Sequence, residues 1–319
     1  MPGAFVISLD FELHWGVRDH TPVSGYRANL LGVREAIPGM LSLFRKHDIA
    51  ATWATVGFLF AETKKDLERH IPRVLPSYTD TRMSPYEAMN EVGADEKSDP
   101  FHFAPSLLRE IAKTPRQEIA THTFSHYYCL EPGQTPQQFE ADLEAAAKIG
   151  EDFGDTCKSI VFPRNQLAPE HLDVLKRRGV RAYRSNGTHW AYRAQLEEPA
   201  PRRLFRLADA YVPLSGARAN ARPSPTPTDT IVDVPASAFL RPYSPKLRHL
   251  DPLRRRRLTR AMTTAARSGR LFHLWWHPHN FGRHPRESLA FLDSLLDSFA
   301  DLRRRYGMES LTMADASRV

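Results

Sequence analysis

The feature that most constrains the fold of this chain is a repeated alternation of short apolar runs with helical stretches. The apolar runs read as strands and lie at residues 4–9, 50–56, 117–121, 158–162, 180–183, 231–234 and 271–276. Stretches with helical spacing separate most of them, at residues 33–47, 105–113, 136–153, 169–178 and 287–306. Strands that alternate with helices are typical of a mostly parallel sheet. We therefore expect an α/β fold whose strands form a closed barrel or an open sheet.

Two segments interrupt this alternation. Residues 62–105 are polar and contain five prolines, and residues 199–228 are rich in proline, arginine and alanine. We expect one domain over residues 1–319, with a long insertion at about 62–105 and a proline-rich loop at about 199–228. Connections as long as the first segment are usually functional or flexible, so this insertion is a candidate wall for a substrate pocket.

The formal net charge of +7 leaves three interpretations open. A basic protein attracts anionic small molecules or nucleic acid, or its surface is basic without a specific partner. Much of the excess lies in Arg254–Arg257 and Arg303–Arg305, which we expect on surface helices. We find no nucleic-acid-binding motif, and therefore predict no nucleic-acid partner.

The sequence also indicates where the protein resides. Its two cysteines, Cys129 and Cys157, do not form a CxxC pair, and we expect two free thiols. The N-terminal residues lack the basic region of a signal peptide. No run of 18 apolar residues occurs, so we predict no transmembrane segment. Together these features predict a cytoplasmic protein.

Polar residues suited to catalysis follow four of the predicted strands directly. The strand ends carry Asp10 and Glu12, then His122 and His126, then Arg164 to Gln166, and finally His277 to Asn280. In α/β barrels the carboxyl ends of the strands form one face, and active sites lie there. We therefore expect these four strand ends to surround one pocket.

The pair His122 and His126, four residues apart, is a candidate for metal binding. On a helical turn both imidazoles would point the same way. Two histidines and one carboxylate form a three-ligand set that leaves positions for water and substrate. The alternative is that these histidines lie on the surface or cap a helix. The acids Asp10 and Glu12 also have an alternative, as a helix cap or a salt bridge.

The other strand-end residues allow two interpretations each. Arg164 either orients a carboxylate and keeps it ionised or lies on the surface. His277 is either a general acid near neutral pH or a buried histidine bonded to the backbone. Trp275 and Trp276 belong to the core or form a platform for a sugar ring.

Five segments together resemble the polysaccharide deacetylases, the NodB-homology group of carbohydrate esterase family four. The resemblance rests on residues 8–16 (SLDFELHWG), 51–57 (ATWATVG), 122–126 (HTFSH), 162–166 (FPRNQ) and 274–278 (LWWHP). The motifs follow the family order from residue 4 to about residue 281. The first motif has a spaced Asp-x-Glu form. In the arginine motif, Asn165, Gln166 and Leu167 follow the arginine where a proline and an aromatic residue are usual.

The resemblance implies a distorted (β/α) barrel with about seven strands and a set of roles. Glu12, His122 and His126 would bind one divalent metal, with zinc the first choice over cobalt, nickel or iron. Asp10 would be the general base, His277 the general acid, and Arg164 would hold Asp10, although the spaced acids leave the roles of Asp10 and Glu12 open to exchange. A backbone N–H near Gln166 or Leu167 would stabilise the oxyanion. We expect substrate contacts from Trp15, Gln166, Trp275 and Asn280.

We therefore predict a metal-dependent hydrolase that removes the N-acetyl group of an amino sugar in surface polysaccharide or glycoconjugate biosynthesis. Its substrate would be a small-molecule or lipid-linked amino sugar, and the basic charge favours an anionic one. One alternative is a hydrolase of a small cyclic amide or another non-sugar acyl amide. A second alternative is a non-catalytic carbohydrate-binding module on the same fold.

Overall fold

The computed structural model describes residues 1–187, 189–195, 199–223 and 231–318. The strands are β1 (Ala4–Phe11), β2 (Ala51–Thr55), β3 (Gln117–Thr121), β4 (Ser159–Val161), β5 (Ala182–Arg184), β6 (Val232–Asp233), β7 (Ala238–Phe239), β8 (Leu271–Trp276) and β9 (Glu309–Leu311). The α-helices are α1 (Val23–Leu31), α2 (Val33–Lys46), α3 (Lys64–His70), α4 (Pro105–Lys113), α5 (Pro136–Ile149), α6 (Pro169–Arg177), α7 (Ala200–Asp209), α8 (Asp251–Ser268), α9 (Pro285–Tyr306) and α10 (Met313–Ala316).

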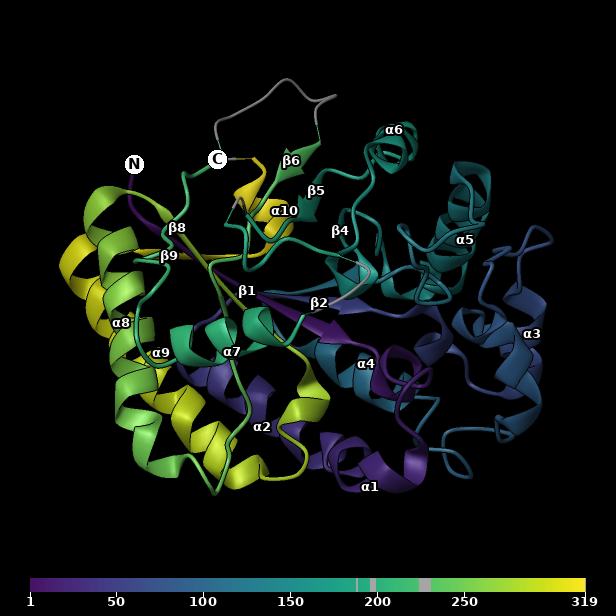
Figure 1. The fold of residues 1–319 in the computed structure, drawn as a ribbon, viewed down its shortest axis with the longest axis horizontal. Helices are drawn as coiled ribbons and strands as arrows, with labels where there is room; N and C mark the ends of the chain where they lie inside the picture. The colour runs from purple at the N-terminus through teal and green to yellow at the C-terminus, as the bar shows by residue number, and fades with distance from the viewer. Residues whose placement is uncertain (188, 196–198, 224–230, 319) are drawn as a thin grey trace.

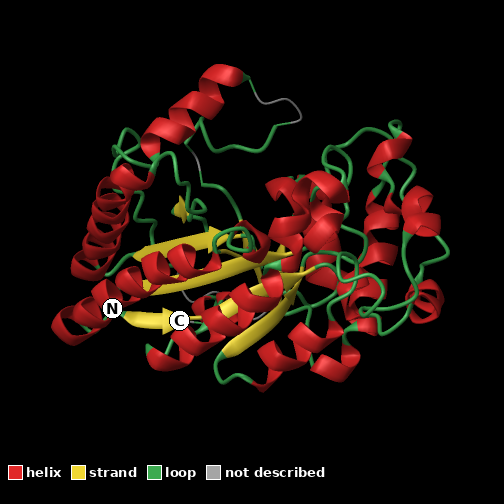
Figure 2. Ribbon diagram, turned by 90° about the horizontal axis from the view of Figure 1, so that it is seen from below, coloured by secondary structure: helices red, strands yellow, loops and turns green. Residues whose placement is uncertain are grey.

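All strand pairs are parallel, and the strands form one curled sheet in the order β6-β5-β4-β3-β2-β1-β8-β7 (Figures 1 and 2). Strand β9 pairs with the first half of β1. The two edge strands, β6 and β7, are only a few residues apart in the chain. The residues between them hydrogen-bond on both sides, because Ala236 N donates to Ser185 O and Ser237 N donates to His273 O. This segment joins the two edges, and the predicted distorted (β/α) barrel is confirmed.

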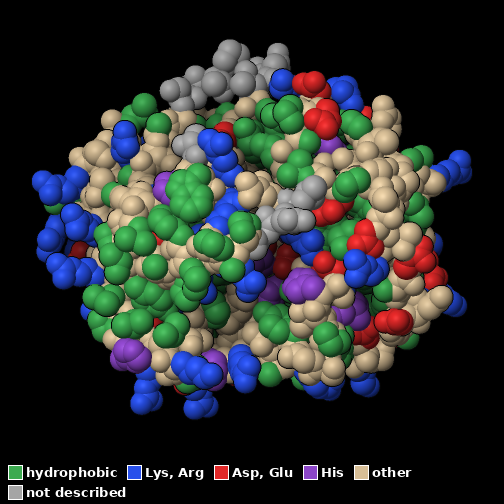
Figure 3. All heavy atoms as spheres, in the orientation of Figure 1, with side chains coloured by type: hydrophobic (Ala, Val, Ile, Leu, Met, Phe, Trp, Pro, Cys, Tyr) green, Lys and Arg blue, Asp and Glu red, His purple; other side chains and the backbone are tan. Residues whose placement is uncertain are grey.

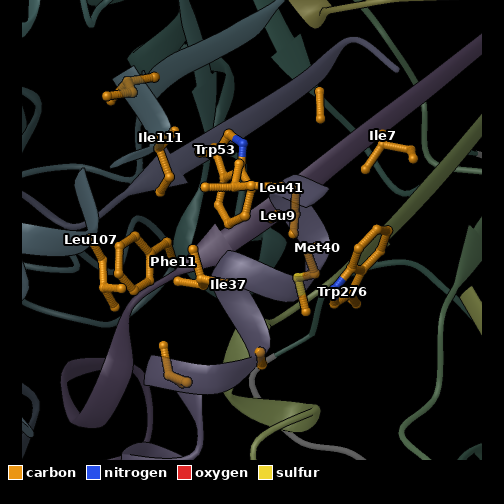
Figure 4. Packing of buried hydrophobic residues seen from close by; sticks show 14 of the residues in the cluster. Ile7, Leu9, Phe11, Ile37, Met40, Leu41, Trp53, Leu107, Ile111 and Trp276 are labelled. Atoms are coloured by element: carbon orange, nitrogen blue, oxygen red, sulfur yellow. The ribbon is translucent and has the colours of Figure 1, made fainter. Parts of the chain in front are cut away.

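Strand β1 lies near the middle of the sheet, and its side chains alternate between the outer and the inner face. Its odd-numbered residues, Phe5, Ile7, Leu9 and Phe11, belong to the large apolar core outside the sheet. Figure 4 shows Ile7, Leu9 and Phe11 packed among side chains of α2, α4, β2 and β8. The even-numbered residues point to the opposite face, as the two-residue period of a strand requires. Asp10 therefore lies on the inside of the curled sheet.

The inside of the sheet is apolar at the amino ends of the strands and polar at their carboxyl ends. A small apolar cluster fills the amino end, with Ala4 and Val6 of β1 packed against residues of β4, β5 and β8. Helix α10 adds Met313 and Ala316 to this cluster. The polar side chains of Ser8 and Asp10 follow along the same face of β1, and both are buried. Because apolar side chains fill the amino end, polar groups that could take part in a reaction lie at the carboxyl end.

Most of the predicted elements are confirmed, and local sequence explains their ends. Helix α5 begins with a capping box in which Thr135 and Gln138 satisfy each other's backbone N–H groups. Helices α8 and α9 end at Gly269 and Gly307, which adopt the left-handed conformation that glycine tolerates. No helix among the described residues is long and apolar enough to cross a membrane. Neither cysteine forms a disulfide bond.

Two predictions about the chain are wrong. The segment 199–228 is not a continuous loop, because Ala200–Asp209 form helix α7; residues 224–228 of that prediction lie outside the described residues. The run 254–257 is not wholly on the surface either. Arg254 and Arg257 are only 3% and 7% exposed, since one face of α8 turns them inward.

Candidate metal and active site

Three side chains that could hold a metal ion meet at the carboxyl ends of β1 and β3. Glu12 Oε2 lies 3.1 Å from His126 Nε2 and 3.3 Å from His122 Nε2, and all three side chains are buried. His122 Nδ1 lies 2.7 Å from the carbonyl oxygen of Val161. Because a carbonyl only accepts, Nδ1 carries a proton, and Nε2 is the nitrogen that faces the cluster. His122 Nε2 has no hydrogen-bond partner, which fits a metal ligand.

The electrostatics of this cluster also suit a cation. Burial lowers the pKa of His126 to about 4, so its imidazole is neutral at neutral pH. Burial raises the pKa of Glu12, but the nearby His277, His122 and His126 outweigh it and hold that pKa well below its usual range. Neutral imidazoles and an ionised carboxylate are the forms that bind divalent metals.

The loop that carries the two histidines is not the helical turn that their spacing predicted. Residues 122–126 form bends, and Thr123 and His126 have positive φ angles of 65° and 59°. Asp142, buried on α5, holds the loop: its carboxylate accepts hydrogen bonds from the N–H groups of Phe124 and Ser125 and from the Ser125 hydroxyl. A backbone conformation that is costly for these residues is thus fixed by a buried acceptor.

Asp10 is held by an arginine that the sequence analysis did not find. Arg184 at the end of β5 donates to both carboxylate oxygens of Asp10, with both N–O distances 2.7 Å. Its guanidinium is completely buried and stacks over the ring of Trp275 at 4.2 Å. Burial raises the pKa of Asp10, but the Arg184 guanidinium overcomes this effect and holds the pKa below its ordinary value.

A chain of hydrogen bonds fixes Arg184 in turn. Arg184 also donates to Ser8 Oγ at 2.9 Å and to Asn165 Oδ1 at 2.9 Å. Ser8 Oγ lies 2.8 Å from His273 Nε2, and His273 Nδ1 donates to Val234 O. Burial lowers the pKa of His273 to about 3, so this histidine is neutral and accepts the Ser8 proton at Nε2. Every member of the chain therefore has a partner, which makes the position of Asp10 well defined.

The prediction that Arg164 holds Asp10 is wrong. Arg164 lies in the turn after β4 with a φ of 53°, and none of its contacts is with Asp10. It forms an ion pair with Asp19 and stacks on the ring of Tyr128 at 4.5 Å. A signal for Arg184 was present in the sequence, because it too is a charged residue at the end of an apolar strand.

His277 stands beside both acids. Its Nε2 lies 3.5 Å from Glu12 Oε1 and 3.9 Å from Asp10 Oδ2, and 24% of its side chain is exposed. On its other side, Asn280 Nδ2 lies 3.3 Å from His277 Nδ1, and the Tyr26 hydroxyl donates to Asn280 Oδ1. Asn280 therefore orients His277, and its contact with substrate stays a prediction.

Two of the other predicted substrate contacts are wrong. Trp15 is 1% exposed, and its indole N–H donates to His102 O, so the ring belongs to the core. Gln166 is 2% exposed; its side chain bonds to Leu130 and Glu131, and its backbone N–H donates to Pro163 O. This backbone N–H is therefore not available to an oxyanion, and Leu167 remains as the candidate donor.

A cavity of about 510 Å³ opens beside this cluster, and Trp275 and His277 form part of its wall. The rest of the wall comes from His20, the turn after β4, the segment between β5 and β6, the residues around β7, and α8. The insertion 62–105 contributes no residue to it, so the prediction that this insertion shapes the pocket is not supported. The fold and the site thus define an α/β barrel with a candidate metal centre and an adjoining cavity at the carboxyl ends of its strands.

The sequence model of the polysaccharide deacetylase family matches residues 25–183. The matched segment contains His122, His126 and Arg164, whereas Asp10, Glu12, Arg184 and His277 lie outside it. The chain belongs to the polysaccharide deacetylase family. None of the curated protein sequences compared with it matches.

Solved structures share the fold at low sequence identity. A protein assigned as a polysaccharide deacetylase from Mycobacterium smegmatis is 13% identical with a TM-score of 0.59, over 99% of this chain and 90% of that one. A similarly assigned protein from Pseudomonas aeruginosa is 12% identical with a TM-score of 0.53, over 99% and 89% of the two chains. A branching enzyme from Pyrococcus horikoshii is 13% identical with a TM-score of 0.54, over 98% and 69%. At such identities the likeness shows the fold alone.

The buried carboxylate of Asp142 yields a prediction about stability and pH. Burial raises its pKa from 3.8 to about 6, so the folded protein disfavours the ionised form. The contribution of this group to stability is complete below about pH 4 and is lost as the pH rises through 6, which amounts to about 3 kcal/mol. In Asp142→Asn this loss should be absent, because the amide does not ionise.

The measurement is urea unfolding of both proteins in the presence of a chelator at pH 4, 5, 6 and 7. The wild-type free energy of unfolding should fall by roughly 3 kcal/mol more than that of the variant over this range. All other acids titrate in both proteins, so the difference isolates Asp142. Parallel curves would contradict the raised pKa.

Proposed function

We propose that the protein hydrolyses the N-acetyl group of an acetylated amino sugar, in surface polysaccharide or glycoconjugate assembly, and that it uses one divalent metal held by Glu12, His122 and His126. The observation that carries this proposal is the position of His277, within 4 Å of both Asp10 and Glu12 and on the wall of the cavity. Membership of the polysaccharide deacetylase family supports the same reaction.

The three proposed ligands fit a metal by their own chemistry. Two imidazole nitrogens and a carboxylate suit zinc best, and also bind cobalt, nickel or iron. His122 Nε2 is buried without a hydrogen-bond partner, an arrangement that is costly unless something else occupies it. When bound, such a cation supplies a Lewis acid that lowers the pKa of water and polarises a carbonyl oxygen.

Asp10 is proposed as the general base. It is ionised at neutral pH because Arg184 lowers its pKa, and it lies beside the proposed ligands rather than among them. An ionised carboxylate in this place can take a proton from the attacking water. The two-point contact with Arg184 keeps the carboxylate in one orientation, which a single point charge would not do.

His277 is proposed as the general acid that protonates the amine as the carbon–nitrogen bond breaks. Its side chain reaches the cavity, its Nε2 faces the two acids, and Asn280 contacts its other nitrogen. An amine is a poor leaving group unless it is protonated, so amide hydrolysis requires a donor at this point.

The first test of this assignment separates the two acids. Glu12→Gln should lose most of the metal that the wild-type protein carries at about one ion per chain, because it removes the carboxylate ligand. Asp10→Asn should keep its metal and release acetate from N-acetylated amino sugars at least 100-fold more slowly, since the base is lost. Elemental analysis and an acetate-release assay on both variants provide the measurement.

Glu110→Gln, on the exposed face of α4, is the matched control and should change neither readout. If Asp10→Asn loses metal and Glu12→Gln keeps it, the two roles are exchanged. A metal-loaded wild-type protein that cleaves an acyl amide but releases no acetate from any amino sugar would favour the non-sugar alternative.

The second test concerns Arg184. Arg184→Lys keeps the positive charge but loses the two-point contact with Asp10. The turnover rate should fall by about 10-fold or more with unchanged metal content, and the acid limb of the pH–rate profile should move to higher pH because the pKa of Asp10 rises. Arg177→Lys, on the exposed side of α6, should behave like the wild type. An unchanged acid limb in Arg184→Lys would show that Asp10 does not set it.

The third test concerns His277. His277→Ala should bind metal normally and lose a factor on the order of 10² to 10⁴ in turnover. The alkaline limb of the pH–rate profile should disappear with it, because that limb reports the loss of the proton that His277 donates. If the histidine were merely structural, the variant would instead melt at a lower temperature with near-normal turnover in its folded fraction.

A further inference from the structure

The wall of the cavity beside His277 is lined by arginines and contains no acid among the residues that the structure describes. Its arginines come from four segments of the chain and are Arg164, Arg193, Arg206, Arg218, Arg241 and Arg257. No Asp or Glu lines the cavity in the described ranges. In Figure 3, Lys, Arg and His side chains gather around the hollow at the centre of this face.

The charges of four of these arginines can be compared with those of their partners. Arg164 pairs with Asp19, and Arg257 pairs with Asp209 at 2.6 Å. Arg218 donates to the carbonyl oxygens of Asn186 and Ala236, which carry no full charge. Arg241 forms no ion pair with any residue that the structure describes. Four guanidinium groups thus face two carboxylates, which leaves an excess of two positive charges.

The two arginines without a carboxylate partner, Arg218 and Arg241, are partly buried, and the neighbouring Arg257 is buried. Arg257 is 7% exposed, and its Nε is buried without a hydrogen-bond partner. Burial lowers the pKa of Arg218 and of Arg241, and neighbouring arginines lower both further. Partly desolvated cations without counterions are costly to maintain. An anionic ligand bound at this place would compensate their charge and remove that cost.

The apolar part of the wall suits the remainder of a ligand. Trp275 and Phe239 lie side by side with a centroid distance of 4.7 Å, next to His277. Tyr192 presents its ring to the Arg218 guanidinium at 3.8 Å. One end of the cavity therefore offers aromatic faces beside the proposed catalytic residues, and the other parts offer guanidinium groups.

We infer that the cavity binds the phosphate group of a phosphorylated amino sugar, with the sugar against Trp275 and the acyl group toward His277. This inference rests on the proposed function and names its substrate class. An excess of two charges matches a phosphate monoester or a diphosphate better than one carboxylate, and guanidinium forks bind phosphate oxygens in pairs. The same phosphate chemistry occurs in a sugar 1-phosphate, a nucleotide diphosphate sugar and a lipid-linked diphosphate sugar.

The test is a set of binding measurements by calorimetry on the metal-loaded Asp10→Asn protein, which should not turn the ligands over. The probes are pyrophosphate, N-acetylglucosamine 1-phosphate, UDP-N-acetylglucosamine, a short-chain polyprenyl diphosphate N-acetylglucosamine in detergent, and neutral chitotetraose. The phosphorylated probes should bind at least 10-fold more tightly than chitotetraose, and their affinity should fall as salt is added. The tightest of the three sugar phosphates identifies the natural source of the phosphate.

Single variants in the same background locate the site. Arg218→Gln and Arg241→Gln should each weaken pyrophosphate binding by about 10-fold or more, whereas Arg267→Gln at the exposed end of α8 should leave it unchanged. Thermal melting of each variant verifies folding, and because Arg241 lacks an ion pair, its replacement should not lower the melting temperature. Equal affinity for chitotetraose and the phosphorylated sugars, or undiminished pyrophosphate binding in both variants, would overturn the inference.

The outcomes also separate the inference from the proposed function. Phosphate binding that depends on Arg218 and Arg241 in a protein that releases no acetate would keep the anion site and reject the deacetylase. Acetate release from N-acetylglucosamine 1-phosphate at wild-type rates and with an unchanged KM in Arg218→Gln and Arg241→Gln would keep the deacetylase and reject the anion site.

Discussion

The buried ion pair between Asp10 and Arg184 is the interaction on which the rest of the site depends. It joins β1 to β5 across the inside of the curled sheet, and Ser8 and His273 tie the same arginine to β8. A buried carboxylate without Arg184 would be protonated at neutral pH or would be expelled. The pair thus sets the protonation of Asp10 and its direction at the same time, and it leaves Glu12 free to face the two histidines.

The layering of the sheet explains why such a costly arrangement can exist at one end only. Small apolar side chains such as Ala4 and Val6 fill the amino end, and α10 covers it. At the carboxyl end the strands diverge into turns that carry polar residues. Several of these turns contain non-glycine residues at positive φ, among them Leu13, Thr123, His126 and Arg164. Strain of this kind persists where the surrounding structure fixes the conformation, and here it flanks the candidate metal centre.

Much of the fold and the centre of the site could be predicted from the sequence. The alternation of apolar runs with helical stretches identified seven of the nine strands that the described residues form and missed the short β7 and β9. The polar residues at strand ends placed Glu12, His122, His126 and His277 together. The pairing of arginines with acids could not be predicted, because it depends on which face each side chain takes after its strand ends. Arg164 lies in a left-handed turn and pairs with Asp19, whereas Arg184 is the last residue of β5 and reaches Asp10. The walls of the cavity were missed for a similar reason, since α7 lies in a segment whose prolines and arginines resemble a loop.

The position of β1 has a consequence for how the chain reaches its native state during synthesis. This first strand pairs with β2 early in the sequence, but its other neighbours are β8 and β9, which include residues 271–276 and 309–311. Contacts of such large sequence separation form late and slowly, and the amino end of a chain leaves the ribosome long before its carboxyl end. The apolar face of β1 therefore stays partly exposed until β8 and β9 have been synthesised. Truncations near the carboxyl end would therefore expose the same strand that carries Asp10 and leads into Glu12.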